Sequence, residues 1–176
     1  MIIETKKRIQ AAFIKLYQEG YARMSITKLC QQVPIARTTF YDYYEHLDQV
    51  LEEIENELIA SILALGVVRR EVDEPFSDLF DAVLDYMKEH ESAFTALMIA
   101  EPDSRFLAKW KTALKVHLDM EFPQGKKDDN RELRLEMVAS AILGGYQYFL
   151  EQKCVVNHIE LRASMVQAVS LLDDFL

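Results

Sequence analysis

Apolar residues recur at helical spacing along most of the chain, and no stretch alternates between apolar and polar residues as a half-buried β-strand does. The first stripe predicts a helix over residues 4–19, with Gly20 in the position of a C-terminal glycine cap. Ser25 is placed to cap a second helix, which Pro34 ends, and a short third helix is expected over residues 36–44. The pattern therefore predicts an all-α protein whose chain opens with three helices.

The rest of the chain continues in the same pattern. Further helices are predicted over residues 48–65, 76–90, 91–100, 105–121, 131–153 and 158–175. Between them we expect a linker at 69–75, a turn at 101–104 and a loop at 122–130, where proline, glycine and charged residues gather. Two short helices braced by a preceding helix are typical of a helix-turn-helix. We therefore expect a helix-turn-helix domain over residues 1–47 and a helical bundle over residues 48–176.

The charge of the chain is distributed unevenly. The formal net charge is −9, yet residues 1–47 hold seven Lys or Arg and four Asp or Glu, a balance of +3 that leaves −12 on the remainder. A net acidic protein is a poor partner for nucleic acid as a whole. A small cationic head on an acidic body instead favours two different tasks in one chain.

The sequence offers little for an enzyme or for a metal site. Its four histidines are scattered, and it lacks the zinc, nucleophile and glycine-rich phosphate-binding patterns. Cys30 and Cys154 lie far apart in apolar helical patterns, which suits reduced thiols. No apolar run has the length of a signal peptide or of a membrane span. We expect a cytoplasmic protein that is not an enzyme and uses neither a metal nor a cofactor.

The segment RTTFYDYYEH, residues 37–46, is unusually dense in aromatic rings. On a helical wheel, Phe40 and Tyr44 share the side that would pack against the first two helices. Arg37 and Tyr41 point to the opposite side, among other polar residues. This polar side could be the solvated face of a small helix, or it could be presented to a partner.

A polar face of this composition suits the major groove of DNA. Arginine can donate two hydrogen bonds to guanine, threonine offers a methyl group to thymine, and hydroxyl groups hold phosphates. The helix-turn-helix frame and the local positive balance favour DNA over a solvated face. Asp42 would read a cytosine amino group or simply tolerate the edge of the groove. The expected contacts are Arg37, Thr38 and Tyr41 to bases, Thr27, Lys28, Thr39 and Tyr43 to phosphates, and Asp42 beside them.

The segment SITKLCQQVPIARTTFYDYYEHLDQVL, residues 25–51, resembles the signature of the TetR family of bacterial transcriptional regulators. The matching residues are Ser25, Ile26, Leu29, Ile35, Thr39, Phe40, Tyr41, Tyr43, Tyr44, Val50 and Leu51. The later segments DAVLDYMKEHESAFTALM, PDSRFLAKWKTAL and AILGGYQYFLEQK are similar to the short C-terminal domain of a branch common in Gram-positive bacteria. The resemblance implies an all-helical homodimer whose heads bind a palindromic operator on double-stranded DNA. We expect a repressor, which a small-molecule inducer of unknown identity could release.

Three positions depart from the family pattern. Pro34 stands where the family usually has glycine, Ala36 where it usually has a serine cap, and Leu47 where a lysine often contacts phosphate. We expect Lys6 and Lys7 to supply backbone contacts in place of that lysine. These departures also support an alternative, a TetR-like protein-interaction module whose DNA binding is weak or lost.

The family resemblance also implies that the last two helices of each subunit form a four-helix dimer interface. The residues expected there are Ala141, Gly144, Gly145, Tyr148, Met165, Ala168, Val169 and Leu172. They could instead belong to the core of a single chain. A ligand pocket is expected at a stripe of rings and methionines that could equally be plain core: Phe80, Met87, Phe94, Met98, Phe106, Trp110 and Tyr146.

Overall fold

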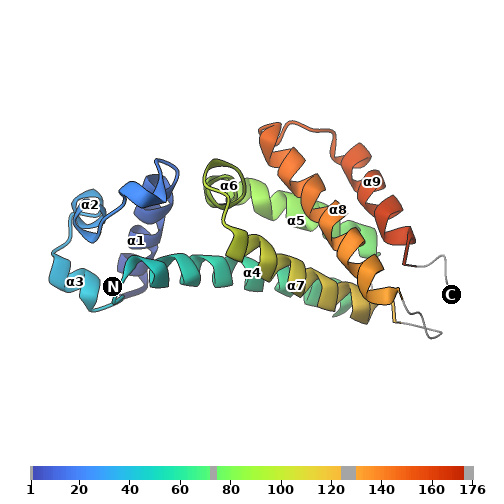
Figure 1. Cartoon of the computed structure of the whole chain (residues 1–176), viewed down its shortest axis with the longest axis horizontal. Coiled ribbons are helices and arrows are strands. Elements are labelled where there is room, and N and C mark those ends of the chain that lie inside the picture. The colour runs from blue at the N-terminus through green and yellow to red at the C-terminus, as the bar shows by residue number, and fades with distance from the viewer. Residues whose placement is uncertain (1, 72–74, 124–129, 173–176) are drawn as a thin grey trace. The chain divides into compact units, whose positions relative to one another are not determined.

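The computed structural model describes residues 2–71, 75–123 and 130–172, and every regular element within these ranges is a helix (Figure 1). The all-α prediction is therefore confirmed. The elements are α1 (Ile2–Tyr17), η1 (Tyr21–Arg23), α2 (Ile26–Gln32), α3 (Arg37–Tyr41), α4 (Leu47–Glu71), α5 (Phe76–Glu89), α6 (Glu91–Thr95), the π-helical turn η2 (Ala96–Ala100), α7 (Ser104–Glu121), α8 (Arg131–Glu151) and α9 (His158–Ser170).

The chain packs into two compact units. The first comprises Met1–Leu58 and Ser92–Asp103, and the second comprises Ile59–Glu91 and Ser104–Leu176. The long helix α4 contributes its first half to one unit and its second half to the other. A functional boundary after residue 47 stays a prediction.

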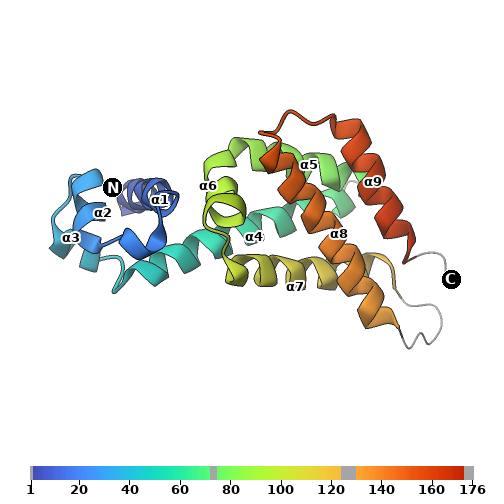
Figure 2. The same ribbon diagram turned by 45° about the horizontal axis from the view of Figure 1, so that its top comes forward.

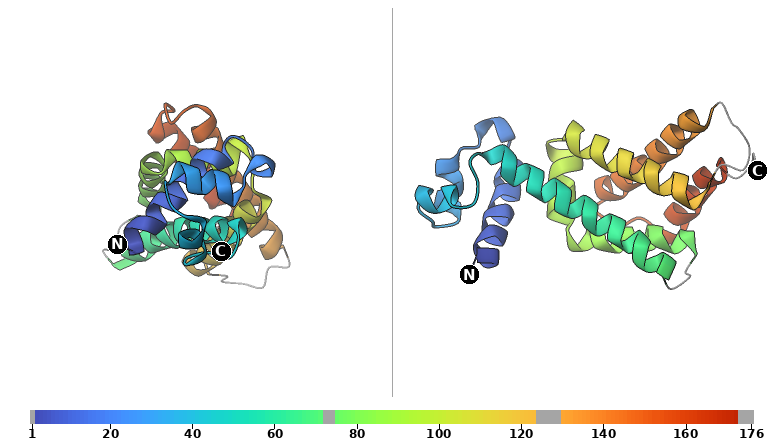
Figure 3. Two further views of the ribbon diagram at one scale, coloured as in Figure 1. Left: turned by 90° about the vertical axis from the view of Figure 1, so that its left-hand side faces the viewer. Right: turned by 90° about the horizontal axis from the view of Figure 1, so that it is seen from below.

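The first unit is built around the stripes that the sequence shows. Helix α1 packs on α2, α2 packs on α3, and η2 packs on α1; Figure 3 shows α1, α2 and α3 packed together. Ile9, Phe13, Leu29, Phe40 and Val50 are completely buried in this unit. At about 25 cal/mol per Å² of apolar surface, each such side chain contributes roughly 1.5–3 kcal/mol of burial free energy. This packing stabilises helices that are individually too short to form in water.

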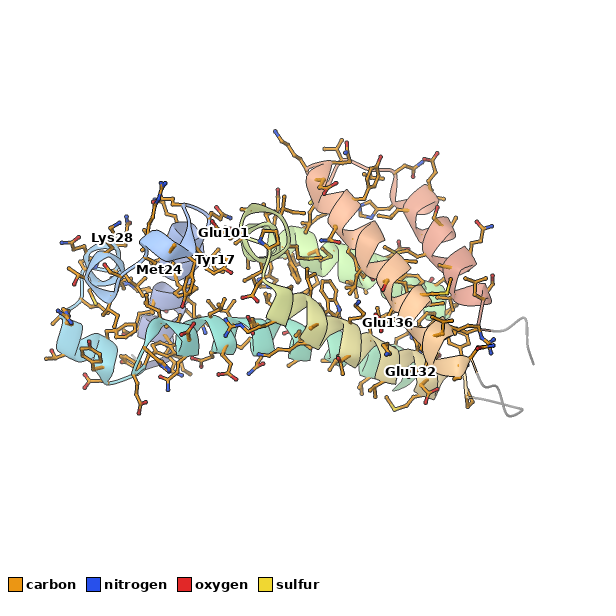
Figure 4. All side chains as sticks on the ribbon, in the orientation of Figure 1. Tyr17, Met24, Lys28, Glu101, Glu132 and Glu136 are labelled. Atoms are coloured by element: carbon orange, nitrogen blue, oxygen red, sulfur yellow. The ribbon has the colours of Figure 1, made fainter. Side chains whose placement is uncertain are left out.

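The second unit is a bundle in which α5 packs on α9, α8 packs on α9, and α7 packs on α8 (Figure 2). Its core holds Phe80, Leu84, Phe106 and Phe149, which are at most 2% exposed. On the surface, Glu136 of α8 accepts hydrogen bonds from the ammonium groups of two α7 lysines at 2.8 and 3.1 Å. Glu132, one turn earlier, pairs with Lys115 of α7, and Figure 4 shows both glutamates on α8.

Several predicted boundaries differ from the observed ones. Helix α3 ends at Tyr41 and not at residue 44, because the amides of Tyr43 and Tyr44 both bond the Phe40 carbonyl at 3.0 Å. Helix α4 extends to residue 71, beyond the predicted end at 65, because Arg69 is buried against Glu121 at 2.7 Å. The start of the predicted linker at 69–75 is therefore helical.

The remaining parts of three predicted segments lie outside the described residues. These are residues 72–74 of the linker, residues 124–129 of the loop and residues 173–175 of the last helix, of which α9 covers 158–170. The short helix η1 had no periodic signal in the sequence, and the predicted helix over 91–100 is divided into α6 and the π-helical turn η2.

The turn between α2 and α3 contains a backbone conflict. Pro34 has φ of 28°, in the left-handed region that glycine favours and that the proline ring opposes. Val33 before it has φ −92° and ψ 0°, a helical conformation that a following proline disfavours. The turn thus keeps the geometry of a glycine turn while carrying a proline, which stores strain next to α3.

We expect Pro34→Gly to raise the free energy of unfolding by about 1–2 kcal/mol, because it removes strain of that order. Pro75 is a matched control, since its φ of −57° suits proline. Pro75→Gly should therefore lower stability by about 0.5–1 kcal/mol through the entropy of the unfolded chain. Chemical denaturation of the two variants measures both effects, and a Pro34→Gly protein less stable than the parent would contradict the strain.

Candidate nucleic-acid interface

The third helix is short and held from one side. Phe40 is completely buried and Tyr44 is 4% exposed, which confirms the predicted division of the aromatic segment by face. Ala36 has the extended backbone of an N-cap residue but makes no side-chain cap bond. Helix α2 is capped as predicted, since the Ser25 hydroxyl accepts a hydrogen bond from the Lys28 amide at 3.2 Å. Side-chain burial, and not capping, therefore holds α3.

The other side of α3 is open to solvent. Arg37, Thr38 and Asp42 are exposed, and Tyr41 is 48% exposed. Thr39 and Tyr43, predicted to flank this face, are half-buried. The structure thus brings the predicted base-reading residues together on one surface.

Arg37 and Tyr41 are in contact on that surface. A terminal guanidinium nitrogen of Arg37 donates to the Tyr41 hydroxyl at 3.2 Å. The guanidinium carbon also lies 6.0 Å from the centre of the Tyr41 ring, within the range of a cation–π contact. The hydrogen bond from Arg37 to Tyr41 raises the pKa of the Arg37 guanidinium.

The start of α2 contributes a second set of polar groups. Thr27 and Lys28 are both exposed there, as a phosphate contact requires. The Lys28 ammonium donates to the Arg23 carbonyl at 2.8 Å, which fixes the lysine at the end of η1 (Figure 4). Arg23 is itself exposed beside Lys28. The sequence did not identify it as a candidate contact residue, because a three-residue helix leaves no periodic pattern.

The basic residues at the start of α1 have different surroundings. The Lys6 ammonium pairs with Glu53 at 2.7 Å and lies 5.2 Å from the centre of the Tyr44 ring. Burial and the neighbouring Glu53 carboxylate raise the pKa of Tyr44. Lys7, by contrast, is exposed. Lys6 therefore ties α1 to α4, and Lys7 is the better placed of the two for a partner.

Two further contacts fix the frame around α3. A guanidinium nitrogen of Arg8 donates to the Val33 carbonyl at 2.7 Å, which closes the end of α2. The Tyr21 hydroxyl donates to the Asp48 carboxylate at 2.6 Å and joins η1 to the start of α4. Both contacts span more than twenty residues, so local sequence patterns do not reveal them.

The C-terminal end of α1 is bonded to residues from a distant part of the chain, the segment 92–103. The Tyr17 hydroxyl donates to the buried Asp103 carboxylate at 3.4 Å, and Figure 4 shows Tyr17 beside Glu101. Burial, followed by the charge of Asp103, raises the pKa of Tyr17 to about 12. The Gln18 amide donates to the Ser92 carbonyl at 2.8 Å. The segment 92–103 thus belongs structurally to the unit that contains α3.

The second unit contains a small apolar cavity of about 30 Å³, room for about two water molecules. Of the predicted pocket residues, Phe80, Trp110 and Tyr146 line it, and the last two rings stack 5.4 Å apart. Burial and then the charge of Asp81 raise the pKa of the Tyr146 hydroxyl. His117 also lines the cavity, and its ring occupies the space that a side chain at Gly66 would fill.

The other four predicted pocket residues are buried elsewhere. Met87 and Phe106 belong to the core of the second unit and do not line the cavity. Phe94 and Met98 belong to the first unit. The structure therefore brings three of the seven predicted residues together around a cavity.

The predicted dimer residues divide into an inner and an outer set. Met165, Val169 and Leu172 are buried within the chain, and a side chain at Gly145 would approach Met165 to 2.7 Å. The outer set comprises Ala141, Gly144 and Tyr148, which are exposed, while Ala168 is half-buried. Leu133 and Met137, more than half exposed, precede the outer set on α8 at intervals of a helical turn. Helix α9 likewise exposes Ile159, Ala163 and Val166.

Searches with family models and among curated proteins found no match. Solved structures do match over nearly the whole chain. A TetR transcriptional regulator from Streptococcus agalactiae 2603V is 19% identical, with a TM-score of 0.74 over 97% of this chain and 94% of that one. A TetR-family regulator described as putative, from Syntrophomonas wolfei, is 14% identical, with a TM-score of 0.73 over 100% and 98%.

This chain has the TetR fold. The resemblance that the sequence predicted is confirmed at the level of the fold by these two structures. A third structure that matches is the dihydroxyacetone kinase operon activator DhaS, 21% identical, with a TM-score of 0.61 over 97% of this chain and 94% of that one. Within the described residues, no helix of this TetR fold combines the length and apolar character of a membrane-spanning segment.

Proposed function

We propose that the protein is a DNA-binding transcriptional regulator that inserts α3 into the major groove. The observation that carries this proposal is the division of α3 between a buried aromatic face and an exposed face of Arg37, Thr38 and Tyr41. An exposed polar face on a rigid short helix is the arrangement that helix-turn-helix proteins use for base contacts. The regulators among the structures of the same fold support the proposal.

The direction of regulation is the finer part of the proposal. We propose a repressor, because a dimer seated on a palindromic operator obstructs the DNA that it covers. One protein of the same fold is described as an operon activator. The α3 surface serves either direction, since it governs where the protein binds and not whether binding there blocks or assists transcription.

We further propose a homodimer formed through α8 and α9. The stripe of Leu133, Met137, Ala141, Gly144 and Tyr148 follows one face of α8, and its residues are exposed in the single chain. Open space surrounds Gly144, where an added Cβ would meet nothing within 4 Å in the described residues. Small residues between large apolar ones allow two helices to approach closely, and a twofold axis would place two heads on successive grooves.

A small-molecule inducer is the third part of the proposal. The cavity beside Trp110 and Tyr146 is lined mainly by apolar side chains, which suits an apolar, uncharged compound. Its volume of about 30 Å³ is below that of a drug-sized pocket, so a ligand must displace the surrounding side chains. Such displacement gives the two states that an allosteric regulator needs.

The alternative function is a protein-interaction module of the same fold with weak or lost DNA binding. The half-buried Leu47, the missing cap at Ala36 and the engagement of Lys6 by Glu53 favour it, because each removes a contact or support that DNA binding would use. DNA selection separates the two functions.

Selection of bound duplexes from a random pool should return a palindrome with half-sites roughly 34–36 Å or more apart. Arg37→Ala should cost about 1–3 kcal/mol at the preferred site and relax the preference at one base pair in each half-site. If no duplex is enriched and Arg37→Ala changes nothing, the regulator is excluded in favour of the interaction module.

Lys7→Ala and Lys6→Ala form a matched pair for the salt dependence of DNA affinity. Only the change at the exposed Lys7 should lower the slope of log affinity against log salt concentration, by about one for each head.

Met137→Glu should convert the dimer to a monomer, because it places a charge in the centre of an apolar interface. The residue is 55% exposed in the single chain, so the fold itself should lose less than about 0.5 kcal/mol. Val68→Glu on α4, where the side chain is 57% exposed, is the control and should leave the dimer intact. Sedimentation velocity measures both, and a dimeric Met137→Glu protein would count against this interface.

A compound that releases the protein from DNA should change the fluorescence of Trp110, the single tryptophan of the chain. The reason is that Trp110 lines the cavity and stacks on Tyr146. Tyr146→Phe should weaken a compound that accepts a hydrogen bond from the hydroxyl by about tenfold. An inducer that leaves the tryptophan emission unchanged acts at another place.

A further inference from the structure

The Arg37–Tyr41 contact joins the first and last residues of α3. The helix has five residues, so these two lie one turn apart on its exposed side. Tyr41 in turn packs its ring edge-on against Phe40, with ring centres 5.7 Å apart and an angle of 80°. Phe40 is completely buried. A continuous path of contacts therefore runs from the core through Phe40 and Tyr41 to the arginine.

This path restrains a side chain that would otherwise be mobile. A free arginine loses up to about 2 kcal/mol of rotamer entropy when it is fixed on a partner. The hydrogen bond to Tyr41 uses one of the five guanidinium N–H groups and leaves the others available for a bidentate contact. The restraint is already present in the free protein, so part of the entropy is lost before binding.

We propose that Tyr41 is a positioning residue, which sets Arg37 for reading a base pair and does not itself supply the specificity. This inference rests on the proposed DNA-binding function and assigns the recognition to a two-residue unit. A direct contact from the Tyr41 hydroxyl to phosphate is the competing role. That contact would change the affinity for every sequence equally, because phosphates carry no sequence information.

The decisive experiment is a double-mutant cycle of Tyr41→Phe and Arg37→Ala, measured on the selected duplex and on duplexes with single base-pair changes. Tyr41→Phe should reduce the preference at the Arg37 base pair by about tenfold and leave the other positions unchanged. In the Arg37→Ala background, it should change binding by less than about twofold. Full additivity, or an equal loss on all duplexes, overturns the proposal in favour of a phosphate contact.

Tyr21→Phe is the matched control, because it removes a hydrogen-bonded hydroxyl from the same unit outside α3. It should leave the base preference unchanged, and thermal unfolding of each variant shows whether it is folded. Arg37→Lys should lose the base preference even with Tyr41 in place, since a lysine does not reproduce the fork of donors by which arginine can bond Tyr41 and a base together.

A measurement on the free protein separates this inference from the function on which it rests. Nitrogen-15 relaxation of the Arg37 side chain should show it ordered in the parent and more mobile in Tyr41→Phe. An enriched duplex with an equally ordered Arg37 in both proteins overturns the positioning role alone. A parent protein that prefers no duplex overturns the DNA-binding function and this inference with it, whatever the relaxation shows.

Discussion

The burial of Phe40 and Tyr44 is the interaction on which the exposed polar surface of α3 depends. A helix of five residues does not form alone, and α3 lacks a side-chain cap. Its conformation therefore comes from the buried ring of Phe40 and from Tyr44, which is buried just after the helix; together they leave the polar residues of α3 on the opposite side. The turn that precedes α3 also contains Pro34 in a strained backbone conformation. The same short segment, residues 37–44, therefore supplies both the buried rings and the exposed polar residues.

Fewer positive charges of the first unit are available to a binding partner than its sequence suggested. The head carries a positive balance, yet the ammonium of Lys6 and the guanidinium of Arg8 are committed to contacts within the unit. Both contacts brace the frame around α3, because Lys6 reaches α4 and Arg8 reaches the end of α2. In the proposed DNA complex, fewer cations would face the phosphates, so the arrangement of the exposed groups matters more than their total charge.

Local patterns in the sequence predicted the helical class, the Ser25 cap and the inward side of α3, because each depends on spacing within a few residues. They could not predict that Lys6 meets Glu53, since those residues lie 47 positions apart. The predicted dimer set mixed inner and outer residues for a related reason. Helices α8 and α9 are apolar on more than one side, and the pattern does not say which side of α8 packs on α7 or which side of α9 packs on α5. The sequence also overestimated the number of residues that line the cavity, because large side chains in a helical stripe mostly fill the core and leave little empty space.

The segment 92–103 bears on how far the head can be treated as an interchangeable module. It comes from the middle of the chain, yet its Asp103 and Ser92 bond Tyr17, the last residue of α1, and Gln18, which follows it. A fragment cut after α3, or after the first half of α4, would leave this side of α1 facing water. Grafting α1–α3 onto another protein of this fold would meet the same difficulty, because the receiving chain must provide an equivalent of the segment 92–103. The proposed recognition surface is therefore simpler to change by replacing exposed side chains on α3 than by exchanging α1–α3 as a block.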